Sequence, residues 1–172
     1  HHALEDRVGG LAYVANRADE TLYDLQDKLD LKVVPRLMVC FDVSHTQGSE
    51  TVASAVVFEN GEPKKAQYRR MRIKGEWGND DYASMHEAVT RWFRRRRDED
   101  APLPDLCVID GGRGQLGAAR QALADLGMDA VALAALAERD EEVFRPGRRN
   151  PVRLERRDRA LHVLQRIRDE AH

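Results

Sequence analysis

The segment PDLCVIDGGRGQLGAARQALADLG, residues 104–127, joins a strand pattern to a helix pattern with almost nothing between them. Residues 104–110 form a short apolar run that ends at Asp110, and the later residues repeat their apolar side chains at helical spacing. A strand that leads directly into a helix is the beginning of a βαβ unit. This segment therefore predicts a sheet that contains parallel strands and is covered by helices.

Gly112, Gly114 and Gly117 of this segment match G-x-G-x-x-G, the spacing of a dinucleotide-binding loop. Such a loop follows the first strand of a parallel series, whereas here it follows the fourth expected strand, after an apparent antiparallel meander. We therefore interpret the glycines structurally. The pair at 111–112 permits a sharp turn from strand to helix, and the stretch 114–117 lets the helix lie close to the sheet.

The rest of the chain alternates between strand and helix patterns. ENGEP supplies the turn residues of a hairpin. Asn79 and Asp80 are candidate caps of a helix. The last helix has one apolar stripe, formed by Leu161, Leu164, Ile167 and Ala171. Strands are expected at 37–44, 51–59, 65–73, 104–110 and 131–137, helices at about 11–30, 78–100, 112–127 and 159–172, and an irregular hairpin or exposed loop at 141–158. This order predicts an α/β fold with a mixed five-stranded sheet, three antiparallel strands and then parallel strands, flanked by helices.

Length and charge restrict the classes of partner. The 172 residues suffice for one domain with a proper core. With 28 Lys and Arg against 30 Asp and Glu, the chain has no global attraction to nucleic acid, so local basic patches must bind any such partner. We expect no membrane span and no secretory signal. Cys40 and Cys107 lie in apolar strand patterns, which favours buried reduced thiols over a disulfide and a cytoplasmic protein.

Two aspartates interrupt apolar strand patterns, where a lone charge is unfavourable. Asp42 lies among Val39, Phe41 and Val43 in the first strand, and Asp110 ends the fourth. On neighbouring strands ~4.8 Å apart, two such charges repel by roughly 3 kcal/mol at an effective dielectric constant near ~20. A hard divalent cation removes this cost. The sequence therefore predicts Mg²⁺ or Mn²⁺ bridging Asp42 and Asp110.

Six motifs in sequence order resemble the C-terminal nuclease domain of UvrC, a subunit of bacterial nucleotide excision repair: FDVSHTQG, TVASAVVFENG, YRRMRI, DDYASM, PDLCVIDGGRGQL and IRDEAH. The resemblance runs from about Pro35 to His172. Residues 35–172 are therefore expected to form the endonuclease domain, and residues 1–34 a tag remnant at His1 and His2 followed by a leading helix. The resemblance implies an RNase H-like endonuclease that uses Mg²⁺ or Mn²⁺ and cuts damaged double-stranded DNA on the 5′ side of a lesion.

The same resemblance implies which residues form the active site. It assigns catalysis and metal binding to Asp42, Asp81, Asp110 and His172. Asp81 has a simpler interpretation as a carboxylate in the first turn of a helix, where the helix dipole favours it. His172 is a candidate second ligand or proton shuttle, because its ordinary pKa lies near neutrality, and it is also a terminal residue that can fray.

The candidate DNA contacts are basic or polar and lie near the aspartates or in the late loop. Arg113 follows Asp110 closely and is a candidate for holding the scissile phosphate, with Gln115 as a helper. Arginines of the 145–157 stretch are candidates for following a DNA backbone, in which case binding weakens steeply with salt. The run Arg94 to Arg97 is typical of a solvated helix end. The DNA-binding set is His45, Arg70, Arg113, Gln115, Arg148 and Arg149.

Two alternatives to a UvrC nuclease stay open. One is another RNase H-like nuclease, such as a resolvase-like or RNA-cutting enzyme. The other is a catalytically idle module that docks DNA or UvrB. The resemblance implies UvrB as a partner through the full-length protein, and it implies no nucleotide cofactor. It also implies that the GIY-YIG nuclease and the helix-hairpin-helix module of UvrC lie outside this sequence, so we expect the isolated domain to be weak or inactive.

Overall fold

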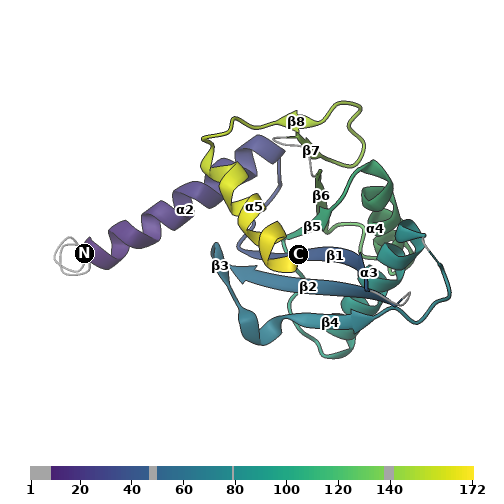
Figure 1. Cartoon of the computed structure of the whole chain (residues 1–172). Coiled ribbons are helices and arrows are strands. Elements are labelled where there is room, and N and C mark those ends of the chain that lie inside the picture. Colours follow the sequence, from purple (N-terminus) through teal and green to yellow (C-terminus); the bar gives the residue numbers. More distant parts are fainter. Residues whose placement is uncertain (1–8, 47–49, 79, 138–141) are drawn as a thin grey trace.

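The computed structural model of the chain has three layers, with a mixed sheet between two layers of helices (Figure 1). It describes residues 9–46, 50–78, 80–137 and 142–172. Helices α2 (Gly9–Leu29) and α5 (Arg159–Ala171) cover one face, and α3 (Asp81–Asp98) and α4 (Arg113–Asp125) cover the other. The N-terminal part of α2 extends away from the rest of the molecule. None of the described helices combines the length and apolar character that a membrane span requires.

The centre of the sheet is β1 (Leu37–His45), which pairs antiparallel with β2 (Thr51–Glu59) and parallel with β5 (Leu106–Asp110). The strand order is β3-β2-β1-β5-β6-β7-β8, and β4 also pairs with β2. The remaining strands are β3 (Glu62–Pro63), β4 (Arg69–Arg72), β6 (Ala132–Leu136), β7 (Glu142–Phe144) and β8 (Val152–Arg153). The α/β fold with a mixed sheet flanked by helices is therefore confirmed.

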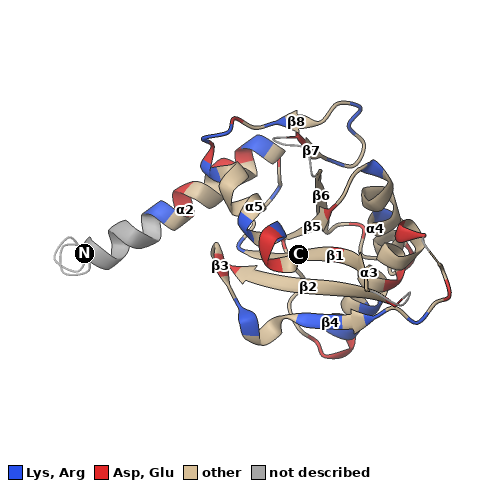
Figure 2. Ribbon diagram, in the orientation of Figure 1, with Lys and Arg blue, Asp and Glu red and all other residues tan. Residues whose placement is uncertain are grey.

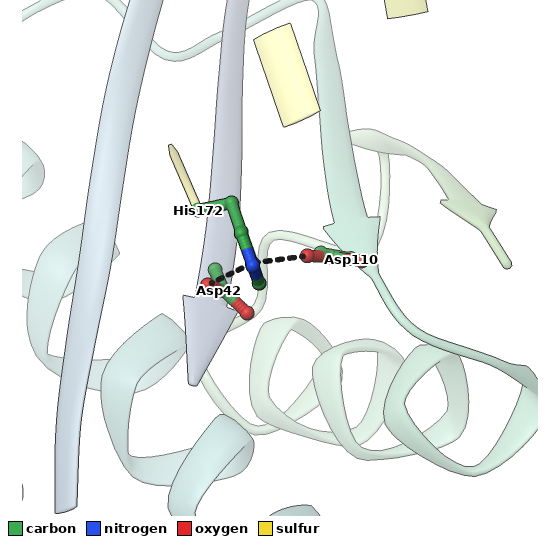
Figure 3. A group of neighbouring side chains, drawn as sticks. All are labelled: Asp42, Asp110 and His172. Atoms are coloured by element: carbon green, nitrogen blue, oxygen red, sulfur yellow. Dashed lines mark ion pairs between the residues drawn. The ribbon is translucent and has the colours of Figure 1, made fainter. Parts of the chain in front are cut away.

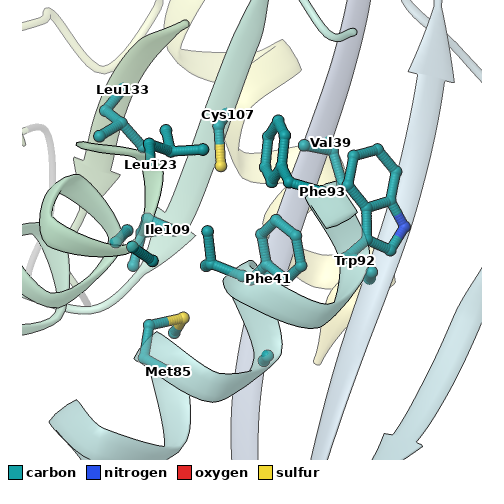
Figure 4. Close-up of a cluster of buried hydrophobic side chains, with 14 of the residues drawn as sticks. Val39, Phe41, Met85, Trp92, Phe93, Cys107, Ile109, Leu123 and Leu133 are labelled. Atoms are coloured by element: carbon teal, nitrogen blue, oxygen red, sulfur yellow. The ribbon is translucent and has the colours of Figure 1, made fainter. Parts of the chain in front are cut away.

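Alternation along the strands divides the core into two halves. In β1, Val39 and Phe41 face α3 and α4, where Phe41 packs edge-on against Trp92 with ring centroids 5.7 Å apart (Figure 4). Met38 and Cys40 face the opposite way, toward α2 and α5. Because successive side chains of a strand point to opposite faces, this pattern determines the face of every later residue in the strand.

Several expected features of the helices are confirmed. Asp80 caps α3 and accepts hydrogen bonds from the backbone N–H groups of Tyr82 and Ala83, whereas Asn79 lies outside the described residues. The expected stripe of α5 is buried against the sheet and α2. The expected leading helix begins at Gly9, and its residues Leu25 and Leu29 belong to the α5 half of the core.

The prediction for the third strand was wrong in its extent. Residues Lys65–Gln67 form a short 3₁₀ helix, η1, and strand pairing is limited to β3 and β4 on either side of it. Both short strands pair with β2, so the chain leaves the edge of the sheet and returns to it. The interrupting residues lack the β-branched and aromatic side chains that favour strands. The late segment forms the β7–β8 hairpin, which extends the sheet beyond five strands.

The two cysteines are free and buried in adjacent strands. Cys40 faces the α5 half of the core and Cys107 faces the α3 and α4 half. The side chains therefore point to opposite faces of the sheet, and the prediction of reduced thiols is confirmed.

The glycines after β5 have different structural roles. Gly111 has φ of 156° and a hypothetical Cβ there would lie 3.0 Å from Gln115, so the sharp turn requires glycine, as predicted. The prediction that the next glycines bring the helix close to the sheet was wrong. At Gly114 a Cβ would lie 2.2 Å from the ring of Tyr82 in α3, whereas at Gly117 nothing lies within 4 Å. The close approach is therefore between two helices, and only at Gly114.

Replacing each of the two helical glycines by alanine tests this difference. Gly117→Ala is expected to stabilise the fold by about 0.5–1 kcal/mol because glycine is a poor helix former. Gly114→Ala is expected to lose that gain because it displaces the Tyr82 ring, and to recover it in a Tyr82→Ala background. Urea unfolding of the four variants measures both effects, and equal gains at the two glycines would contradict the assigned contact.

Candidate active site

Strand alternation directs Asp42 and Asp110 to the same face of the sheet. In β1, Asp42 follows Met38 and Cys40 on the α5 side, and in β5, Asp110 follows Leu106 and Val108 on that side. The parallel register pairs Met38 with Leu106 and continues to Phe41 with Ile109, so the aspartates come next on both strands. The expected adjacency of these two strands is confirmed.

The third member of the cluster comes from the end of the chain. Helix α5 packs through its apolar stripe onto the same face, and His172 follows its last residue. The Nδ1 atom of His172 lies 3.4 Å from Asp42 Oδ2 and 3.9 Å from Asp110 Oδ2 (Figure 3). The His172 side chain is 76% exposed, against 13% and 15% for the two aspartates. The site is therefore a pair of half-buried carboxylates under an accessible imidazole.

The surroundings disfavour two negative charges. Burial, and then the charge of Asp42, raises the pKa of Asp110 to about 6. Burial also raises the pKa of Asp42, and the neighbouring His172 opposes this shift. A cation between the carboxylates would favour their charged forms and so offset both the burial and the mutual repulsion.

The donor atoms fit a hard divalent cation. Two carboxylate oxygens and one imidazole nitrogen, from Asp42, Asp110 and His172, all lie within 4.8 Å of one another. Carboxylate oxygens are the preferred ligands of such ions, and an imidazole nitrogen is an acceptable one. These three side chains are therefore the residues that could hold a metal.

Asp81 lies apart from this cluster and has a different partner. It begins α3, on the opposite side of the sheet, and its Oδ1 lies 2.6 Å from Nε2 of His45. Nδ1 of the same imidazole lies 3.0 Å from Oγ1 of Thr51. His45 has the strand parity of Phe41, so it faces α3. The metal-capable cluster found among the described residues does not include Asp81, and its role in catalysis stays a prediction.

The residues predicted to contact DNA lie in several different parts of the structure. Gln115 caps α4 by accepting a hydrogen bond from Gly112 N at 3.1 Å. Arg113 donates to the carbonyl oxygens of Arg148 and Arg149, and its guanidinium lies 4.6 Å from the ring centroid of Phe144. Arg70 is an exposed residue of β4. The contacts of these residues with DNA stay predictions.

The comparisons with known proteins agree with this geometry. The family model described as "UvrC RNAse H endonuclease domain" matches residues 26–172. The chain belongs to this family. It is 57% identical to UvrABC system protein C of Gemmatimonas aurantiaca over 99% of this chain and 28% of that protein. It is 49% identical to the protein of the same name from Gloeobacter violaceus, over 98% of this chain and 28% of that one.

The chain therefore spans about 28% of the length of these UvrC relatives. Among solved structures it is similar to endonuclease V of Ciona intestinalis in complex with an inosine-containing DNA. That similarity has a TM-score of 0.46 with 14% identity, and it covers 95% of this chain and 69% of that one.

One residue of this UvrC domain was missed at the sequence level. The charge of Arg168 lowers the pKa of Asp110, against the two larger causes that raise it. Arg168 precedes His172 by four residues, and such a pair shares one helix face. Its spacing from His172 was the signal that could have identified it. The cluster therefore has a fixed positive charge beside the titratable imidazole.

Removing one carboxylate should stabilise the metal-free domain in a pH-dependent way. A carboxylate whose pKa is raised on folding costs stability as pH rises above its unfolded pKa, and the cost is complete above its folded pKa. In EDTA, Asp110→Asn is expected to be more stable than the parent above about pH 6. The gain is on the order of 1–2 kcal/mol after allowance for solvent screening, and it shrinks as pH falls toward about 4. Urea unfolding across this range measures it, and a gain independent of pH would argue against the charge pair.

Proposed function

We propose that this chain is the metal-dependent endonuclease domain of a UvrC protein, which hydrolyses a phosphodiester bond of damaged double-stranded DNA on the 5′ side of a lesion. The observation that carries the proposal is the convergence of Asp42, Asp110 and His172 from three distant segments. Membership of the UvrC RNase H endonuclease domain family supports it. UvrB is the proposed partner through the full-length protein, and the proposed location is the cytoplasm.

In this proposal Asp42 and Asp110 hold Mg²⁺ or Mn²⁺, with His172 as a further ligand or as a proton carrier. A bound divalent ion lowers the pKa of water and neutralises charge that develops on the phosphate. The chain's own contribution is to keep two carboxylates on adjacent strands, Asp42 within β1 and Asp110 at the end of β5. His172 is the exposed member of the site, so it can exchange protons with solvent and the substrate.

The competing functions differ in what they require of these residues. A catalytically idle docking module has no need for two half-buried carboxylates whose mutual repulsion opposes folding. The raised pKa of Asp110 therefore favours an enzyme over a scaffold. Another RNase H-like nuclease would use the same cluster, and membership of the UvrC family argues against it.

A Mn²⁺ titration followed by thermal unfolding tests the metal site. Mn²⁺ is expected to raise Tm of the parent, because a ligand that binds only the folded state stabilises it. Asp42→Asn is expected to abolish the rise. Asp98→Asn is the matched control, since Asp98 is exposed at the end of α3 and lies outside the cluster, and it should retain the rise. The absence of a shift in the parent would favour the idle module.

The position of the cut requires the complete system. We expect that a full-length UvrC carrying this domain, combined with UvrB and lesion-bearing DNA, loses the 5′ incision when Asp110 is replaced by Ala. The 3′ incision should remain, and end-labelled DNA on a denaturing gel distinguishes the two products. Loss of the 3′ incision alone would refute the assignment.

A further inference from the structure

A pocket lined by arginines lies on the α4 side of the sheet, opposite the side that Asp42 and Asp110 face. It has a volume of about 430 Å³ and lies between α4 and the connection from β7 to β8. Basic stretches of both segments lie on the same side of the molecule (Figure 2). The arginines that line it are Arg113, Arg120, Arg145, Arg148 and Arg149.

Two of the five arginines hold the pocket together. Arg113 donates to the carbonyl oxygens of Arg148 and Arg149 and stacks on Phe144. Arg145 is half-buried and donates to the carbonyl oxygens of Leu29 at 3.0 Å and Leu133 at 2.5 Å. Each of these two guanidinium groups therefore gives two of its five N–H donors to backbone carbonyl oxygens. They therefore position the connection but leave its net positive charge unneutralised.

The other three arginines are exposed. Within the described residues, Arg120 and Arg149 have no ion-pair partner, and Arg148 pairs with Asp30 at 3.1 Å. Asp30 is 83% exposed, so it offsets little of the charge. Burial, and then the charge of Arg148, lowers the pKa of Arg145. Among the described residues, the five arginines of the pocket thus make one ion pair, that of Arg148 with Asp30.

The pocket is also close to the carboxylates along the chain. Arg113 begins α4 three residues after Asp110, and Arg113, Gly117 and Arg120 share one face of that helix. From Arg113 to Arg120 the helix rises ~10 Å. This face of α4 therefore leads away from the end of β5, where Asp110 lies.

We propose that the pocket binds backbone phosphate groups of the DNA strand a few nucleotides from the scissile bond, through Arg120, Arg148 and Arg149. Arg113 is a positioning residue that holds the connection carrying Arg148 and Arg149. This inference rests on the proposed nuclease function and adds a substrate-binding site to it. A free phosphate or pyrophosphate ion has the same chemistry, so the experiment separates the two sources.

The first test measures affinity for a fluorescein-labelled DNA duplex by anisotropy over about 50–200 mM salt, in EDTA. Arg148→Ala/Arg149→Ala is expected to weaken binding roughly tenfold and to reduce the slope of log K against log salt by about 2. The control is Arg94→Ala/Arg95→Ala, which removes the same charge from the far end of α3, and its slope should equal that of the parent. Equal losses in both variants, or no measurable binding by the parent, would overturn the proposal.

A second test uses the open position in the pocket. A Cβ at Gly117 meets nothing within 4 Å and Gly117 lines the pocket, so Gly117→Glu is chosen to bring a carboxylate among the arginines. We expect it to weaken DNA binding about as much as the double arginine variant. Gly117→Gln, of the same size but neutral, should stay within about twofold of the parent. Equal effects of Glu and Gln would mean that charge in the pocket is irrelevant to binding.

A third measurement separates the two phosphate sources. At constant ionic strength, inorganic phosphate and pyrophosphate are expected not to displace the duplex. Saturable displacement by either ion, together with an unchanged salt slope in Arg148→Ala/Arg149→Ala, would identify a free-phosphate site and overturn the proposal. Mn²⁺ stabilisation measured on the same variants should be intact. If Mn²⁺ does not stabilise the parent, that result counts against the nuclease function. It does not decide whether the pocket binds DNA.

Discussion

The repulsion between Asp42 and Asp110 is the interaction on which the rest of this structure depends. Both carboxylates end apolar stretches of adjacent parallel strands, so neither can move away without shifting a buried strand. The sheet therefore holds two like charges together at its edge, and burial makes this unfavourable. Such an arrangement persists only where something compensates. The nearby basic side chains are those of Arg168 in α5 and of His172, which directly follows that helix.

Much of this site could be predicted from period-2 alternation. Asp42 and Asp110 occupy equivalent positions at the ends of apolar runs, and an aspartate in an apolar strand pattern is conspicuous. The stripe of α5 likewise predicts which side of that helix packs on the sheet, and hence where His172 is carried. His45 and Asp42 point to opposite faces of the sheet because they are three residues apart in one strand. Once the contact of His45 with Asp81 is known, this alternation separates Asp81 from the cluster.

The rest could not be predicted because it depends on contacts between residues far apart in sequence. Arg113 lies beside Asp110 along the chain, which suggested a phosphate ligand, but its partners are carbonyl oxygens 35 and 36 residues later. The contact of Gly114 with Tyr82 depends on how α3 and α4 pack. The prediction made the third strand too long because its residues are exposed, so no alternation of buried and exposed side chains marks where the strand ends. Local sequence patterns therefore predict which face of a helix or strand is buried better than they predict which other elements that face contacts.

The two groups of arginines show why charge in the sequence is a poor guide to charge on the surface. In the run at the end of α3, Arg95 pairs with Glu99, Arg97 lies by Asp98, and Arg96 donates to Pro102 O. The arginines that line the pocket between α4 and the β7–β8 connection make, within the described part of the chain, one ion pair, between Arg148 and the exposed Asp30. A polyanion approaching two carboxylates is repelled unless cations lie along its path. Under the proposed function a divalent ion would relieve that repulsion at the scissile phosphate, and fixed charges such as these would serve the flanking phosphates.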